Sequence, residues 1–337
     1  MQHTIAVDLS KTIFQVAEAG VRPGGVARNR RFTRRQFERY VSERPPSRFI
    51  LEACGSAHYW GRQLLAQGHE VKLLPPHRSR VYRTGDKTDR ADTKSLLEAE
   101  RNEEILPVPV KSEDQQCLAS LHRLRSGYVR SRTARLNAIR GLLREYGISI
   151  AVGARHVVSA VYTLKPEEIP APLRAGLDDA VQEIRALEER IESIELNLEA
   201  LVRQTPLAQR LLTVPGIGLV TATALTGLVG DFRRFASGRC FASYLGLVPK
   251  EHSSGAKRRL GHISKRGDTY LRMLLIHGAR MVLNWAHRKE TLSGLEQWAL
   301  RVEARRGRNI ATVALANKIA RIAWVVATEE RDFRRIA

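Results

Sequence analysis

The sequence is poor in cysteine, in acidic residues and in aromatic residues. Its 337 residues include three cysteines, Cys54, Cys117 and Cys240, which stand far apart and form no CxxC motif or Cys/His cluster. This argues against a disulfide framework and against the usual zinc sites, and it fits a reducing, cytoplasmic environment. The amino-terminal stretch MQHTIAVDLSK lacks the organisation of a signal peptide.

Long hydrophobic runs are also scarce. One charge-free stretch, residues 211–230, is long enough to cross a bilayer, but it contains Pro215, four glycines and four threonines. Because its PGIG motif would break a helix near the start, we expect two short buried helices around a turn and no membrane span.

Basic residues outnumber acidic ones. The chain has 56 Lys and Arg against 35 Asp and Glu, a formal net charge of +21 and a pI of about 10.6. Hydrophobic residues make up 43% of the chain, enough for folded domains. So large a positive excess favours nucleic acid as the partner, because neutralising phosphates releases counterions.

The first region, residues 1–108, alternates expected strands and helices. Strands are predicted at TIAVD, FQVAEA, VARNRRF, RFILEA and EVKLLPP, with helices over TRRQFERYVSE and near residues 58–67. This order predicts an α/β domain with a mixed sheet. A further helix begins in DKTDRADTKSLLEAERN, and Pro107 and Pro109 mark the boundary of the domain.

The second region, residues 109–205, is expected to be helical and begins with a very basic helix over 112–146. From Arg123 to Arg144 there are seven arginines and no Asp or Glu. A solvated helix face would explain them, and so would a helix that follows phosphates. The candidates to bind nucleic acid are Arg123, Arg130, Arg135 and Arg140.

A coiled coil is expected later in the second region. Residues 148–172 contain three prolines and are predicted to be irregular. The apolar residues that follow alternate spacings of three and four, which predicts either a coiled-coil hairpin or a dimer helix, or packing against the chain itself. This heptad stripe consists of Leu177, Ala180, Ile184, Leu187, Ile191, Ile194, Leu198 and Leu201.

The third region, residues 206–337, is predicted to be mostly helical. Short helices are expected in 231–249 and long ones over 268–288 and 309–327. The PGIG motif resembles the turn of a helix–hairpin–helix element, whose glycines let the backbone approach a phosphate. A simple turn between core helices is the alternative. The motif residues are Pro215, Gly216, Ile217 and Gly218.

The stretch KEHSSGAKRRLGHISKRG, residues 250–267, cannot build a core. Six Lys and Arg accompany one acid, Glu251, and two adjacent serines. A serine hydroxyl can attack phosphorus when it is deprotonated and the phosphate charge is neutralised, yet this predicted loop alone supplies no base. The candidates to hold the phosphate backbone are Lys257, Arg258, Arg259, Lys265 and Arg266.

Four carboxylates supply a second candidate site. Asp8 and Glu52 each end a predicted buried strand, and Asp89 and Asp92 stand three apart at a helix start. The alternative for the latter pair is structural: Asp89 caps the helix, and the negative charge of Asp92 interacts favourably with the helix dipole. Four converging carboxylates need cations between them, and two Mg²⁺ ions can clamp the oxygens of a phosphoryl transfer.

Together these motifs resemble the DEDD-type insertion-sequence transposases, relatives of the Piv/MooV site-specific invertases, and in particular the subgroup with a double-serine motif. The resemblance covers nearly the whole chain. It is carried by AVDLSK, LEACGS, DKTDRADTKSLLEA, VPGIG, FASYLGLVP and HSSGAKRRLGHISKRGDTYLRMLLIHGAR.

The resemblance implies three parts: a RuvC-like domain with the RNase H fold, a helical coiled-coil region and a transposase domain with a catalytic serine. The tetrad would be Asp8, Glu52, Asp89 and Asp92. The nucleophile would be Ser254, the serine directly before glycine, with Ser253 as the alternative. The resemblance also implies donor and target DNA, a structured non-coding guide RNA, a homo-oligomer (dimer or tetramer) and a bacterial, nucleoid-associated location.

The leading hypothesis is therefore an RNA-guided, Mg²⁺-dependent DNA recombinase that forms a phosphoserine intermediate. Two alternatives remain. One is a RuvC-type junction resolvase or nuclease that uses water as the nucleophile, and the other is a non-catalytic nucleic-acid-binding scaffold. A covalent protein–DNA intermediate separates the first hypothesis from the second, and Mg²⁺-dependent cleavage separates both from the third.

Overall fold

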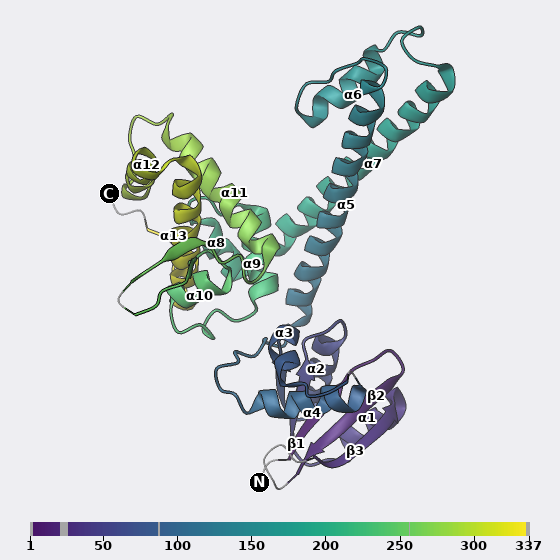
Figure 1. Ribbon diagram of the computed structural model, residues 1–337, viewed down its shortest axis with the longest axis vertical. Coiled ribbons are helices and arrows are strands. Elements are labelled where there is room, and N and C mark those ends of the chain that lie inside the picture. Colours follow the sequence, from purple (N-terminus) through teal and green to yellow (C-terminus); the bar gives the residue numbers. More distant parts are fainter. Residues whose placement is uncertain (1–2, 21–25, 87, 256, 335–337) are drawn as a thin grey trace. The chain divides into compact units, whose positions relative to one another are not determined.

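A five-stranded mixed sheet lies at the centre of the amino-terminal part of the chain (Figure 1). Its strands are β1 (Thr4–Asp8), β2 (Ile13–Ala19), β3 (Val26–Thr33), β4 (Arg48–Glu52) and β5 (Glu70–Leu74), in the order β3-β2-β1-β4-β5. β1 is antiparallel to β2 and parallel to β4, and β4 is parallel to β5. The predicted mixed α/β sheet is confirmed.

The structure is a computed structural model that describes residues 3–20, 26–86, 88–255 and 257–334. The chain divides into two units, residues 1–116 and 117–337. The first unit contains the sheet and its helices. The second contains the helices predicted for the coiled-coil region together with those of the carboxyl-terminal region.

Helices cover both faces of the sheet. α1 (Arg34–Ser42) and α2 (Ala57–Ala66) cover one face, where Phe14, Phe37 and Trp60 meet edge to face. α4 (Asp89–Glu100) covers the other face and places Leu96 and Leu97 in a core with Ala6 and Ile50. Between β5 and α4 lie α3 (Pro76–Ser79) and the 3₁₀ turn η1 (Arg80–Tyr82).

Two long antiparallel helices, α5 (Glu113–Arg144) and α7 (Ala171–Val202), form an arm in the second unit. Ion pairs between arginines of α5 and glutamates of α7 follow one another in antiparallel order along the arm. They are Arg125–Glu195 at 2.6 Å, Arg132–Glu188 at 3.5 Å and Arg135–Glu183 at 2.6 Å. The two helices are therefore joined by charge pairs along their length.

The heptad stripe lies on α7 and most of it is buried within the chain. Ile184 packs in a core with Leu136 and Ile139 of α5, and Leu198 packs in a core with Leu118 of the same helix. The buried residues of the stripe are Leu177, Ile184, Leu187, Ile191, Ile194 and Leu198. Packing against the chain itself, one of the arrangements that the sequence leaves open, therefore accounts for the stripe.

The segment between α5 and α7 differs from the prediction. The sequence predicts an irregular segment over 148–172, but α6 (Ala154–Thr163) lies there. Val157 and Val161, one helical turn apart, are buried in a core with Leu136 and Ile139 of α5. The prolines at 166, 170 and 172 come after this helix, so they do not interrupt it.

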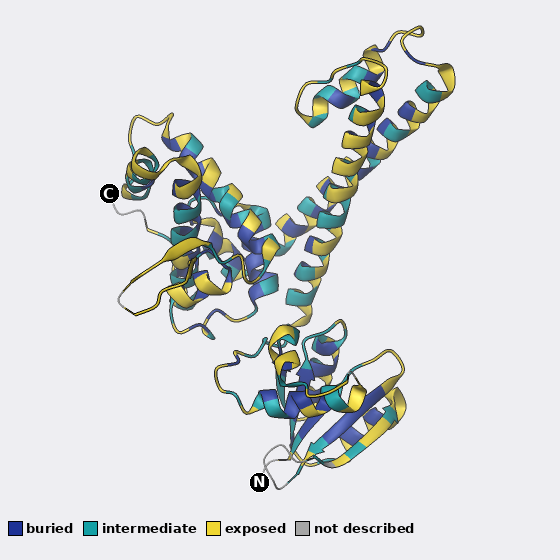
Figure 2. Cartoon of the chain, in the orientation of Figure 1, coloured by how far each residue is buried: buried dark blue, intermediate teal, exposed yellow. Residues whose placement is uncertain are grey.

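Six helices form the carboxyl-terminal body: α8 (Pro206–Leu212), α9 (Leu219–Val229), α10 (Gly238–Tyr244), α11 (Thr269–Ala286), α12 (Gly294–Arg306) and α13 (Arg308–Thr328). Their core includes Leu225, Phe241, Leu275 and Ile319, all fully buried. Figure 2 colours the buried residues of these helices dark blue. The sequence did not predict α12. By length and composition α13 could cross a membrane, but 44% of its most apolar window is buried inside this body.

Candidate functional site

Two acids follow neighbouring parallel strands at one edge of the sheet. Val7 of β1 is in register with Leu51 of β4, so Asp8 and Glu52 come next at the carboxyl ends of both strands. Side chains alternate along a strand, and Ala6 and Ile50 face α4. Asp8 and Glu52 are therefore on the face of the sheet that α4 covers.

The other two acids lie in the first turn of α4. Thr88 is the N-cap, because its hydroxyl accepts a hydrogen bond from the Ala91 N–H at 3.1 Å. The alternative in which Asp89 caps the helix is therefore wrong. Negative charge at this helix start is favoured by the helix dipole, so the dipole explanation still applies to both acids.

Arginines make ion pairs with acids of the tetrad. These pairs are Arg83–Asp92 at 3.1 Å, Arg80–Glu52 at 3.9 Å and Arg31–Asp89 at 4.0 Å. Within the described ranges, no group of three or more His, Cys, Asp or Glu side chains is placed to hold a metal ion. The four acids offer carboxylate oxygens, which are ligands that Mg²⁺ prefers. A cation bound by them would have to replace the guanidinium groups of these arginines.

The serines belong to a β-hairpin rather than to the predicted loop. β6 (Pro249–Glu251) pairs antiparallel with β7 (Leu260–Ile263). At the base of the hairpin, the Lys265 N–H donates to the Gly246 carbonyl at 3.2 Å. A Cβ on Gly267 (φ +99°) would lie 1.8 Å from the Tyr244 carbonyl oxygen, so only glycine fits this contact.

The two serine hydroxyls have different surroundings. The Ser253 hydroxyl donates to Glu251 Oε1 at 2.7 Å and accepts from the Arg259 N–H at 3.1 Å. Ser254 pairs with Lys257 through backbone hydrogen bonds, and within the described part of the chain its hydroxyl has no partner. Both serines are exposed.

Exposed cations surround the hairpin. Arg258 pairs with Glu251 at 3.4 Å, so this carboxylate is shared with Ser253. The remaining predicted cations of the stretch are exposed, and they are Lys257, Arg259, Lys265 and Arg266. The arrangement is a positively charged surface around an available hydroxyl, which suits contact with a phosphate backbone.

The PGIG motif forms the turn between α8 and α9, as predicted. Gly216 has φ +85°, and its carbonyl oxygen packs so closely on α11 that a Cβ on Gly278 would lie 1.9 Å from it. Ile217 is buried, whereas Gly218, the N-cap of α9, is exposed. The close packing explains both Gly216 and Gly278 without a ligand, and phosphate binding at this turn remains a prediction.

The arginines of α5 fall into two groups. One group holds the arm together: Arg125, Arg132 and Arg135 pair with glutamates of α7, and Arg140 donates to the carbonyls of Ala151 and Gly153. The other group is exposed and makes no ion pair in the described ranges, and it consists of Arg123, Arg130 and Arg144. The second group is available to an anion.

Sequence reasoning missed a buried histidine in the same helix. His122 of α5 contacts Thr223 Oγ1 of α9 at 2.9 Å and the Tyr270 hydroxyl of α11 at 3.0 Å. Burial, with a smaller contribution from Arg125, lowers the pKa of His122 to about 4. A single histidine beside arginines gives no distinctive pattern, because its partners lie 101 and 148 residues further along the chain.

Comparisons with known proteins cover both sites. Residues 6–148 match the DEDD family model of the IS110 group, described as "Transposase", and residues 208–293 match the model described as "Transposase IS116/IS110/IS902 family". The four acids lie in the first match and both serines in the second.

Relatives match over most of their length. A "Probable family 20 transposase" of Pseudomonas aeruginosa is 43% identical over 334 residues, 98% of each chain. The "Transposase for insertion sequence element IS1328" of Yersinia enterocolitica is 36% identical over 98% of each chain. A more distant relative, the "Pilin gene-inverting protein" of Moraxella lacunata, is 25% identical over 84% of this chain and 81% of its own.

Proposed function

The chain belongs to the IS116/IS110/IS902 transposase family, and from that premise we propose that it cuts and rejoins DNA strands through a phosphoserine linkage at Ser254. The observation that carries the proposal is the Ser254 hydroxyl, which has no partner among the described residues and lies on an exposed, basic hairpin. The adjacent Ser253 hydroxyl already has a donor and an acceptor, which supports Ser254 as the nucleophile.

In the proposed reaction, the Ser254 oxygen attacks the scissile phosphorus and the bond to one DNA oxygen breaks. The serine proton passes to water, and the oxygen of the departing strand takes up a proton from water and leaves as a hydroxyl group. Because the energy of the broken ester is kept in the new one, a second strand can replace the serine without a nucleotide cofactor. Lys257, Arg258 and Arg259 would hold the phosphate backbone during both steps.

The tetrad is proposed to hold two Mg²⁺ ions. A DEDD-type domain suggests divalent metal use, and Asp8, Glu52, Asp89 and Asp92 supply the oxygen donors. When bound, such ions would neutralise phosphate charge and lower the pKa of an attacking hydroxyl. Asp8 and Glu52 are suited to this role because their strands fix them at one edge of the sheet.

A covalent adduct is the test of the reaction. Labelled donor DNA should remain attached to the wild-type protein in denaturing electrophoresis, and peptide mapping should place the linkage at Ser254. Ser254→Ala should bind DNA without forming the adduct. Recombination without any adduct would favour water as the nucleophile, and binding without Mg²⁺-dependent cleavage would favour a scaffold.

The proposal includes a structured guide RNA, donor and target DNA, and a homo-oligomer. Arg123 and Arg130 support RNA binding because they are exposed and make no ion pair in the described ranges. Sequencing of RNA that copurifies with the protein should recover one specific species. Arg130→Ala should weaken the binding of this RNA. It should also reduce by about one the magnitude of the slope of log K for binding against log salt concentration. The matched control Arg135→Ala should act mainly on the arm, because Arg135 pairs with Glu183.

A further inference from the structure

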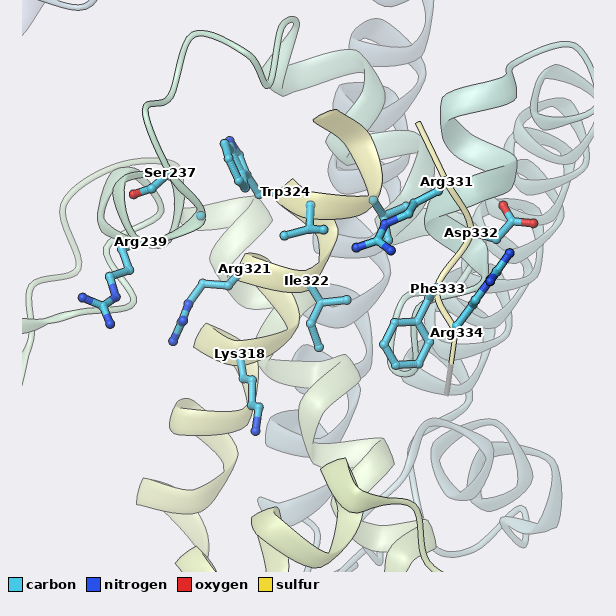
Figure 3. A pocket seen from close by; sticks show the side chains of 13 residues that line it. Ser237, Arg239, Lys318, Arg321, Ile322, Trp324, Arg331, Asp332, Phe333 and Arg334 are labelled. Atoms are coloured by element: carbon cyan, nitrogen blue, oxygen red, sulfur yellow. The ribbon is translucent and has the colours of Figure 1, made fainter. Parts of the chain in front are cut away.

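A cavity of about 920 Å³ lies between α10, α13 and the segment that follows α13. Neither the hairpin serines nor the PGIG turn belongs to its lining. Figure 3 shows side chains from the three segments around it. Those used below are Arg239 of α10, Lys318, Arg321, Ile322 and Trp324 of α13, and Asp332, Phe333 and Arg334 of the last segment.

Hydrogen bonds hold two aromatic residues of the lining in place. The Trp324 indole N–H donates to the Phe232 carbonyl at 3.0 Å. The Phe333 N–H donates to the Thr213 hydroxyl at 2.8 Å, which ties the last described segment to the start of the PGIG turn. Trp324 and Phe333 are partly exposed, and Ile322 of α13 lines the cavity with them. The cavity therefore offers apolar and aromatic surfaces, with the Trp324 ring and the backbone at Phe333 held by hydrogen bonds.

Positive charge exceeds negative charge in the lining of this cavity. In the described ranges, Arg239, Arg321 and Arg334 make no ion pair, and the acid in the lining, Asp332, is also unpaired. Lys318 lies over the Trp298 ring at 4.2 Å. Burial first, and then the charges of Arg321 and Arg301, lower the pKa of Lys318. The cavity thus favours an anion.

The geometry points to a binding site for an unpaired nucleotide of a single strand. Its phosphate would contact Arg239, Lys318 and Arg321, and its base would lie against Phe333 or Trp324. The volume is ample for a base with its sugar and phosphate. A paired base cannot use such a site, because its neighbours in the duplex cover both faces.

This inference rests on the proposed function in one respect, that the protein handles nucleic acid, and it adds where a single-stranded nucleotide is held. An unpaired nucleotide could belong to DNA or to RNA. Two probes separate these sources: an oligodeoxynucleotide with 4-thiothymidine and an oligoribonucleotide of the same sequence with 4-thiouridine.

The test combines photo-crosslinking with affinity measurements on the full chain. Crosslinks from at least one probe should map by mass spectrometry to α13 or to residues 331–334. Arg321→Gln and Phe333→Leu should weaken single-strand binding roughly five- to tenfold while duplex binding changes less. Phe333→Leu keeps apolar volume but removes the aromatic face. The matched control is Arg305→Gln, which removes an exposed charge from α12 outside the cavity.

Absence of crosslinks in these segments with both probes would overturn the site, as would variant affinities equal to that of Arg305→Gln. The Ser254 adduct, measured on the wild-type protein, keeps the two proposals separate. Adduct without crosslinks contradicts the nucleotide site alone, whereas crosslinks without adduct contradict the proposed reaction alone.

Discussion

Ser253 and Glu251 are joined by a 2.7 Å hydrogen bond from hydroxyl to carboxylate, and the Arg259 N–H donates to the same hydroxyl from the other side of the hairpin. The first bond lies within one side of the hairpin and the second joins its two sides, both directly beside Ser254. We therefore expect Ser253 to position the neighbouring residue, in keeping with the proposal that Ser254 is the nucleophile.

Ser253→Ala should retain the DNA adduct but form it more slowly. Losing a hydrogen-bonded hydroxyl typically costs about 1 kcal/mol, so the rate should fall roughly fivefold. Ser253→Thr keeps a hydroxyl and should restore much of the rate. Single-turnover adduct formation, followed by electrophoresis, measures both. An adduct that maps to Ser253 would reverse the assignment.

Arg83→Gln should increase the affinity for Mg²⁺ in calorimetric titrations. Arg83 contacts Asp92 at 3.1 Å, and a cation at this carboxylate must displace it. A partly exposed pair is worth up to about 1 kcal/mol, so the gain should be roughly two- to fivefold. Arg101→Gln, which removes the partner of Glu98 at the other end of α4, is the control. Weaker Mg²⁺ binding would instead show that Arg83 supports the site.

Strand patterns predicted the first unit well. Short apolar runs such as TIAVD and RFILEA contain β1 and β4, and parallel pairing brings their terminal acids to one edge. The sequence could not predict that Arg80 and Arg83 contact acids of the tetrad, because these contacts depend on the path of the chain between β5 and α4.

The hairpin was harder to predict than the sheet. Its strands are short and exposed, so they lack the alternation of apolar and polar residues that marks a half-buried strand. What holds its base is contact between backbone segments at Gly246 and Gly267, which a list of residue types does not reveal. The difference between the Ser253 and Ser254 hydroxyls likewise depends on this geometry.

Ile191→Asp should destabilise the arm. Ile191 belongs to the heptad stripe of α7 and is 7% exposed, and a charge buried there without a partner should cost about 3 kcal/mol or more. Leu196→Asp changes a residue of the same helix that is 60% exposed, so stability should change little. Urea denaturation compares the two, and light scattering reports assembly. A lower oligomer mass with unchanged stability in Ile191→Asp would favour a contact between protomers.

The last prediction concerns the pH dependence of folding. His122 has a pKa of about 4 in the folded chain, against about 6.5 when unfolded, because burial and Arg125 disfavour its protonated form. Because the folded state binds this proton less readily, the contribution of His122 to the free energy of unfolding is complete above pH 6.5. That contribution is lost as the pH falls toward 4. Across this pH range the free energy of unfolding therefore falls by about 3 kcal/mol.

His122→Gln should lower stability at pH 7 and flatten this dependence. His58 in the first unit also has a pKa of about 4, chiefly through burial, so the measurement must be local. Hydrogen exchange of α9 and α11, compared between variant and wild type at each pH, reports the surroundings of Thr223 and Tyr270. An equal loss of protection in both proteins between pH 6.5 and 4 would show that His122 does not set the pH response.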